Sequence, residues 1–158
     1  MNELNALIKD FLTHYTFNNI DILLSERKIL SLEKEDLIEK LINRKRGGYC
    51  FENNQYFFNL LKDKGYEVNR YLGRVVYGKS NDVPRTHQLT IVNLKEGKFL
   101  ADVGFGPYTP GIALPMSGES VTAFNGNTYR LVKLNEFDFQ LETLREGEYF
   151  SLYQFNLM

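Results

Sequence analysis

The chain has 158 residues, 43% of them hydrophobic, and a formal net charge of −1, which suits one globular domain or two very small ones. The sequence has nineteen Lys and Arg residues and twenty Asp and Glu residues, so the basic excess of a nucleic-acid-binding protein is missing. The apolar runs are too short for a membrane span, and residues 1–10 lack the apolar stretch of a signal peptide. We therefore expect a cytoplasmic protein with no nucleic-acid or membrane partner.

Cysteine and histidine are scarce in this sequence. Cys50 is the single cysteine, and His14 and His87 are the two histidines, so no intrachain disulfide can form and a four-ligand zinc site cannot be assembled from them. We expect no metal. A single cysteine with a histidine downstream is the outline of a thiol enzyme, although a buried, inert cysteine is the commoner case. His14, near a helix end, is interpreted as a surface or packing residue.

The first third of the chain is predicted to be helical. Apolar residues recur at helical spacing in residues 2–15, and an extended or turn stretch is expected to follow in residues 16–24. A second helix is expected from Ser31, with basic residues 44–46 at its C-terminal end and Gly47 and Gly48 after it. A third helix should run from Cys50 to Gly65, with Phe57 and Phe58 in the core.

After residue 65 the sequence is rich in strand-forming residues. Strands are predicted at residues 68–77, 87–94, 98–103, 121–124, 129–134, 138–144 and 148–155. The turn KEGK joins two of them, 87–94 and 98–103, in a hairpin. We therefore expect an α+β fold, in which a helical bundle of residues 1–65 packs on a small antiparallel β-barrel of residues 66–158.

The segment RGGYCFENN, residues 46–54, places Cys50 at the start of a helix, just after a glycine turn. Free N–H groups and the helix dipole favour a thiolate there, and the Cys50 N–H is a candidate donor to an oxyanion. His87 can act as the base. Antiparallel pairing in the hairpin brings Asp102 beside His87, where it can orient the imidazole. Docking of the helices on the sheet would complete a Cys-His-Asp arrangement like that of cysteine proteases.

Three segments, RGGYCFENN, PRTHQLTIVNL and ADVGFG, occur in this order and together resemble the arylamine N-acetyltransferase family. The resemblance extends from about residue 11 to residue 155. It implies ping-pong transfer, in which acetyl-CoA acylates Cys50 and a small arylamine, hydroxyarylamine or hydrazine then takes the acetyl group. His87 would be the base and Asp102 the residue that fixes its tautomer. Such a transferase acts in xenobiotic metabolism.

The resemblance also implies roles for residues around these three. Phe17 resembles the aromatic of the family's Pro-Phe-Glu-Asn-Leu segment, which packs near the cysteine. The glutamate of that segment is Asn18 here, so the charge of Arg46 is left to some other acid, and Glu52 is one candidate. The edge of the acyl and substrate cleft would be formed by Thr86, Gly104, Phe105 and Gly106. The two glycines could equally serve only to turn the chain after the hairpin.

Family members carry further helical residues at the N-terminus and a third, C-terminal lid domain, neither of which is present in this sequence. The lid helps to bind CoA and shields the thioester from water. An alternative function is therefore a weakly active or inactive member, acting as a thiol hydrolase, an amide synthase or a non-catalytic binding module with exposed apolar surface. A papain-like protease is not favoured, because its cysteine signature is absent. Self-association to a homo-oligomer is left open.

Overall fold

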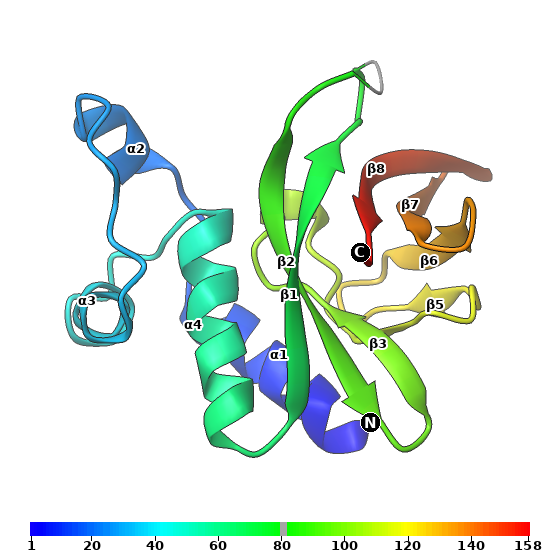
Figure 1. Cartoon of the computed structure of the whole chain (residues 1–158), viewed down its shortest axis with the longest axis horizontal. Coiled ribbons are helices and arrows are strands. Elements are labelled where there is room, and N and C mark those ends of the chain that lie inside the picture. The colour runs from blue at the N-terminus through cyan, green and yellow to red at the C-terminus, as the bar shows by residue number, and fades with distance from the viewer. Residues whose placement is uncertain (80–81) are drawn as a thin grey trace.

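The computed structural model describes residues 1–79 and 82–158, and its α-helices precede its strands along the chain (Figure 1). The helical elements are α1 (Asn2–His14), α2 (Ile20–Leu24), α3 (Lys34–Leu37), the π-helix η1 (Ile38–Asn43), α4 (Cys50–Asp63) and the 3-10 helix η2 (Gly106–Tyr108). The strands are β1 (Glu67–Val75), β2 (Arg85–Leu94), β3 (Gly97–Ala101), β4 (Leu114–Pro115), β5 (Val121–Thr122), β6 (Thr128–Lys133), β7 (Asp138–Arg145) and β8 (Glu148–Asn156). The predicted α+β class is confirmed.

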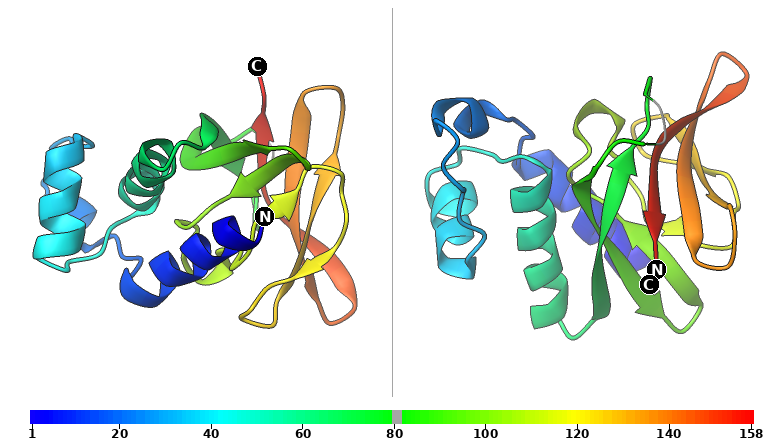
Figure 2. Two further views of the ribbon diagram at one scale, coloured as in Figure 1. Left: turned by 90° about the horizontal axis from the view of Figure 1, so that it is seen from below. Right: turned by 45° about the horizontal axis from the view of Figure 1, so that its top comes forward.

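All eight strands belong to one antiparallel sheet, in the order β4–β3–β2–β1–β8–β7–β6–β5. The sheet curls strongly into a nearly closed barrel (Figure 2), and β1 joins its two halves because it pairs with β2 on one side and with β8 on the other. Apolar residues that alternate along the strands fill the inside of the curl, among them Leu89, Leu100, Leu131, Leu141 and Leu152. The predicted small antiparallel barrel is therefore confirmed.

A second core joins the helices to the outer face of the sheet. The apolar stripe of α1 packs against α4 and against β2 and β3. The residues of this second core include Leu4, Ile8 and Phe11 of α1, Leu61 of α4, Val92 of β2 and Phe99 of β3. Burying each such side chain contributes about 1.5–3 kcal/mol. Phe57 belongs to this core as predicted, but Phe58 lies outside it and is only half-buried, with its ring 4.8 Å from the Arg70 guanidinium of β1. This packing holds the N-terminus of α4 at the start of β2.

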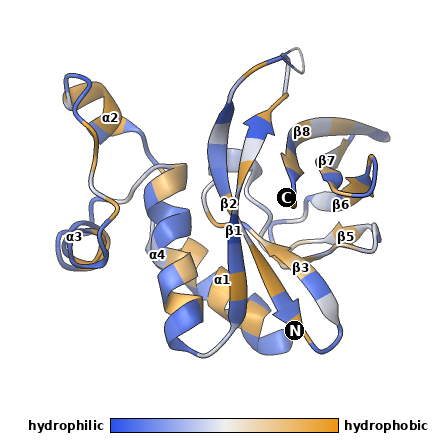
Figure 3. Cartoon of the chain, in the orientation of Figure 1, coloured by the Kyte–Doolittle hydropathy of each residue, from blue (hydrophilic) through white to orange (hydrophobic). Residues whose placement is uncertain are grey.

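The segment between α1 and α4 differs from the prediction. Residues 16–24, expected to be extended or turn, contain the short helix α2, which the periodicity does not indicate because none of its residues is buried. The next helix begins at Lys34 rather than after Ser31, and it continues as the π-helix η1. Figure 3 shows apolar residues on α2, which with α3 lies outside the two cores. Within residues 1–79 and 82–158, no helix has the length and apolar character to cross a bilayer.

The predicted strands are all present, with ends shifted by a few residues. The strand predicted at 98–103 ends at Ala101, so Asp102 follows the strand instead of lying in it. The short strand β4 was not predicted, because it consists of two residues, Leu114 and Pro115, which pair with Leu100 and Phe99 of β3. The predicted hairpin of β2 and β3 is confirmed, with Leu94 opposite Gly97.

Candidate active site

Cys50 is the first residue of α4, and the glycine turn before it is held against residues 16–18. The Gly48 N–H donates to the Thr16 carbonyl at 3.1 Å, and the Asn18 N–H donates to the Gly48 carbonyl at 3.0 Å. Gly47 has φ +69°, and a Cβ there would lie 2.5 Å from the Thr16 carbonyl oxygen, so only glycine fits. The predicted glycine turn before the cysteine helix is confirmed.

The Cys50 side chain faces the start of β2. It is half-buried, and its Sγ donates to the Thr86 carbonyl at 3.5 Å. Gly73 of β1 pairs with His87 whereas Arg74 pairs with Arg85, so Thr86 is an extra residue in β2, a β-bulge. Such a bulge changes the direction of the local backbone. It thereby lets the Thr86 carbonyl meet the thiol while the next residue, His87, points into the protein.

Asp102 is fully buried and accepts four hydrogen bonds. His87 Nε2 donates to Oδ2 at 2.6 Å, and the Tyr153 hydroxyl donates to the same oxygen at 2.8 Å. Asn54 Nδ2 and the Gly104 N–H each donate to Oδ1 at 2.9 Å. Burial alone would raise the pKa of Asp102, but the charge of His87 and the hydrogen bonds from His87, Asn54 and Gly104 outweigh it and lower that pKa. The carboxylate therefore stays ionised in the interior.

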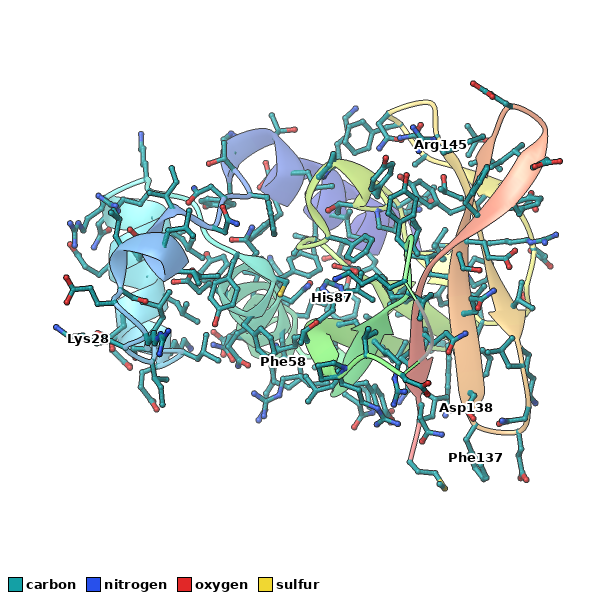
Figure 4. The ribbon with its side chains drawn as sticks, turned by 90° about the horizontal axis from the view of Figure 1, so that it is seen from above. Lys28, Phe58, His87, Phe137, Asp138 and Arg145 are labelled. Atoms are coloured by element: carbon teal, nitrogen blue, oxygen red, sulfur yellow. The ribbon has the colours of Figure 1, made fainter. Side chains whose placement is uncertain are left out.

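His87 lies between Asp102 and the Cys50 side of the site, at the centre of the view in Figure 4. Because Nε2 is bonded to Asp102, Nδ1 is the ring nitrogen that can serve the thiol. Burial lowers the pKa of His87, yet the Asp102 carboxylate, with a smaller contribution from Cys50, raises it overall to about 9. The rings of Phe105 and Tyr153 each lie 4.8 Å from the imidazole and fix its plane.

The two glycines after Asp102 have different tasks. A Cβ on Gly104 would lie 2.7 Å from Asn54 Nδ2 and 3.0 Å from the Cys50 Cα, so this glycine allows the chain to approach the start of α4. Gly106 has φ +60° and turns the chain, and a Cβ there would lie 3.4 Å from the Phe17 ring. Phe17, 43% exposed, thus stands beside Gly106 near the site.

The expected pairing of Arg46 with Glu52 is wrong. Arg46 Nη2 instead binds Asp21 of α2 at 2.6 Å, and Glu52 binds Lys40 at 2.6 Å. Lys40 also binds Asp21, at 2.7 Å, so α2, η1 and α4 share one network of ion pairs. The short helix α2, absent from the prediction, is what brings Asp21 to Arg46. Hydrogen bonds from Arg46 and Lys40 lower the pKa of Asp21 to about 2.

Glu52 has a role at the helix start instead. Its Oε1 accepts a hydrogen bond from the Tyr49 N–H at 3.2 Å, as in a capping box. Asn18, which replaces the family's glutamate, donates from Nδ2 to the Arg46 carbonyl at 2.8 Å and not to its guanidinium. Both contacts stabilise the turn that precedes Cys50.

Two residues of the site were missed in the sequence, Asn54 and Tyr153. Asn54 follows Cys50 by one helical turn, so it shares a helix face with the cysteine, and that spacing could have revealed it. Its Nδ2 also donates to the Gln88 carbonyl at 2.6 Å, and its Oδ1 accepts from the Val103 N–H at 3.0 Å. Tyr153 comes from β8, far along the chain, and no sequence signal marks it. His14 is exposed, as predicted.

Comparisons with known proteins agree with this fold. The family model for N-acetyltransferases matches residues 1–158. The arylamine N-acetyltransferase of Escherichia coli (strain K12) is 37% identical over 142 residues, which cover 89% of this chain and 50% of that protein. The chain therefore spans about half the length of the curated relatives it matches.

Solved structures give the same result. The arylamine N-acetyltransferase of M. tuberculosis matches with a TM-score of 0.90 and 33% identity, covering 99% of this chain and 60% of that one. The Mycobacterium marinum arylamine N-acetyltransferase, solved in complex with CoA, matches with a TM-score of 0.90 and 31% identity, covering 99% and 59%. This chain belongs to the arylamine N-acetyltransferase family.

Proposed function

We propose that this chain is an acyltransferase that carries an acetyl group from acetyl-CoA, through a Cys50 thioester, to an arylamine, hydroxyarylamine or hydrazine. The observation that carries the proposal is the buried His87–Asp102 pair, set beside a cysteine at the start of a helix. Membership of the family, and the CoA complex of the M. marinum relative, support the choice of donor.

In the first half-reaction, the Cys50 thiolate attacks the acetyl carbonyl carbon and the bond from that carbon to the CoA sulfur breaks. The CoA thiolate leaves and takes a proton from the His87 imidazolium. The raised pKa of His87 keeps this proton available at neutral pH. The Cys50 N–H, at the start of α4, is the proposed donor to the transient oxyanion.

In the second half-reaction, the amine nitrogen attacks the thioester carbonyl and the carbon–sulfur bond to Cys50 breaks. His87 accepts the proton that the amine loses, which restores the imidazolium beside the cysteine thiolate. Asp102 stabilises the imidazolium in both halves and holds its tautomer through Nε2. No metal takes part in this scheme.

The acceptor amine is proposed to enter beside the residues predicted to form the substrate cleft, among them Phe17, Thr86 and Phe105. The rings of Phe17 and Phe105 offer apolar faces on which an aryl group can stack. Phe105 contacts His87, and Phe17 stands beside Gly106, so the two rings border the same loop. Thr86 contributes its carbonyl to the cysteine side of this entrance. A flat aromatic amine suits such a site.

The two predicted parts of the chain meet at the proposed site. Residues 1–65 supply the nucleophile and residues 66–158 supply the histidine and the carboxylate. Asn54 spans the junction, because it stands on α4 and donates both to Asp102 and to the Gln88 carbonyl. We infer that activity depends on this docking.

Product analysis tests the proposal. The protein is incubated with acetyl-CoA and an aniline, and the N-acetylated amine, free acetate and free CoA are each measured. The expected result is one acetylated amine for each CoA released. Cys50→Ser, a control of nearly identical shape, should produce neither acetylated amine nor free CoA. Release of acetate without acetylated amine would identify a hydrolase, and CoA release equal to that of Cys50→Ser would contradict a role for the cysteine.

A further inference from the structure

Two tyrosines and an arginine gather where three elements end near the proposed site. Tyr77 follows β1, Tyr108 ends η2 and Arg145 ends β7. Arg145 Nη1 donates to the hydroxyl oxygens of both tyrosines, each at 3.0 Å, and these oxygens lie 3.4 Å apart. The Arg145 guanidinium also lies 5.2 Å from the centre of the Tyr108 ring. One arginine side chain is thus held from two sides.

This guanidinium is held in place but not neutralised. Arg46 and Arg130 each bind a carboxylate, whereas Arg145 makes no ion pair within residues 1–79 and 82–158. Glu148 lies opposite it in the β7–β8 hairpin, yet no ion pair joins the two. The nearby phenols of Tyr108 and Tyr77 raise the pKa of Arg145, so it carries its full charge. Because Nη1 serves the phenols, the donors on Nη2 and Nε can serve an anion.

The cluster is tied to the proposed site through one loop. Tyr108 is the last residue of η2, and η2 begins directly after Phe105, whose ring lies 4.8 Å from the His87 ring. Figure 4, which looks down on this end of the molecule, shows Arg145 to one side of the central His87. In a CoA thioester, the pantetheine arm separates the phosphates from the reacting carbonyl. The phosphates must therefore bind away from Cys50.

We propose that Tyr77, Tyr108 and Arg145 form the anion site that binds the phosphate groups of the CoA donor. This inference rests on the proposed acetyl transfer and adds a place for the charged end of its donor. A guanidinium presents N–H groups in a fixed plane, which matches two phosphate oxygens, and here the two phenols fix that plane in advance. The phenol hydroxyls can rotate to donate to the same anion.

The test compares two acetyl donors, acetyl-CoA and 4-nitrophenyl acetate, which has no phosphate. Arg145→Gln should raise the KM for acetyl-CoA by about 10- to 100-fold, because hydrogen bonds to a charged phosphate are lost. Its rate with 4-nitrophenyl acetate should stay within about twofold of wild type. Arg130→Gln is the matched control, since Arg130 is also on the sheet surface but bound to Glu142, and it should leave both donors unchanged.

Three results would overturn the inference. The first is a KM for acetyl-CoA that Arg145→Gln raises no more than Arg130→Gln does. The second is an equal loss with both donors, which would mean a general structural defect. If the wild type transfers acetyl from neither donor, the proposed function fails. Direct titration of the protein with CoA then tests the anion site separately. CoA should bind Arg145→Gln at least tenfold more weakly than wild type, and equal binding is the third contrary result.

Discussion

On the sheet side of the candidate site, Asp102 is fully buried and accepts four hydrogen bonds, whereas on the helical side Asp21 joins Arg46 and Lys40 near solvent. The His87–Asp102 pair is fixed by its packing against aromatic rings. The glycine turn before Cys50 is fixed by backbone contacts and surface ion pairs.

The helical side is also the more exposed one. The apolar side chains of Leu23, Leu24 and Ile29, on and after α2, are 75%, 69% and 99% exposed. An ion pair near solvent adds only about 0–1 kcal/mol to the stability of the fold. A buried charge that loses its partners lowers that stability by several kcal/mol. The comparison teaches that changes to the buried Asp102 network should reduce activity and stability together, and that changes to the Asp21 ion pairs should reduce either one little.

The largest effect is expected from Asp102→Asn. The amide keeps the shape of the side chain but presents no charge to His87, so the imidazolium loses its stabilising partner and its tautomer is no longer fixed. Acetyl transfer should fall about 10³-fold or more, measured as initial rate with acetyl-CoA and an aniline. Circular dichroism checks the fold. A folded variant with a loss below about tenfold would contradict the role of the carboxylate.

His87 should make stability depend on pH. Its pKa is raised from 6.5 to about 9, so the stability it contributes is complete below pH 6.5 and is lost as pH rises through 9. The contribution is about 3 kcal/mol at most, from 1.36 kcal/mol per unit. Urea unfolding from pH 6 to 10 should show this decline in wild type. His87→Gln should remove this decline. If the free energy of unfolding fell equally with pH in the two proteins, the stabilising role of the His87–Asp102 pair would be contradicted.

Gly104→Ala should disturb the junction between the two sides. A methyl group would lie 3.0 Å from the Cys50 Cα and 2.7 Å from Asn54 Nδ2, so the loop must shift. The expected cost is about 1–3 kcal/mol of stability, with at least a tenfold loss of transfer rate. Gly126→Ala is a control for backbone strain alone, because φ there is +83° but a Cβ meets no atom within 4 Å, so it should lower stability without slowing transfer. An active, stable Gly104→Ala protein would show that the close approach is dispensable.

The smallest effect is expected from Asp21→Asn. Its carboxylate has a pKa of about 2, so the ion pairs contribute above pH 4 and are lost as pH falls through 2. Because the network is near solvent, the loss at pH 7 should be below about 1 kcal/mol, with transfer slowed less than threefold. Thermal unfolding at pH 7 and pH 3 measures it. A loss as large as that of Asp102→Asn would show that both sides are equally critical.

The parts of the fold that follow from local pattern could be predicted. The hairpin of β2 and β3 has alternating apolar residues around a short glycine turn, and its register alone places Asp102 near His87. α1 and α4 were predictable because the buried apolar residues of each helix follow helical spacing: Leu4, Ile8 and Phe11 in α1, and Phe57 and Leu61 in α4. α2 was not, since an exposed helix leaves no buried face in the sequence.

The candidate site was predictable where a motif carried it and not where distant strands supply it. The sequence around Cys50 correctly predicted a helix that starts after a glycine turn. Tyr153 reaches Asp102 from β8 only because the sheet curls, and no local pattern contains that information. Arg46 was assigned the wrong acid for the same reason, because Asp21 becomes its neighbour only through the folding of α2.

The most direct measurement is the intact mass of the protein after brief exposure to acetyl-CoA, with Cys50→Ser and His87→Gln in parallel. Wild type should gain the mass of one acetyl group, and an aniline added afterwards should remove it. Cys50→Ser should gain none, and His87→Gln should gain it much more slowly. Acetylation of wild type that persists in Cys50→Ser, or no adduct at any acetyl-CoA concentration, would contradict acetyl transfer through Cys50.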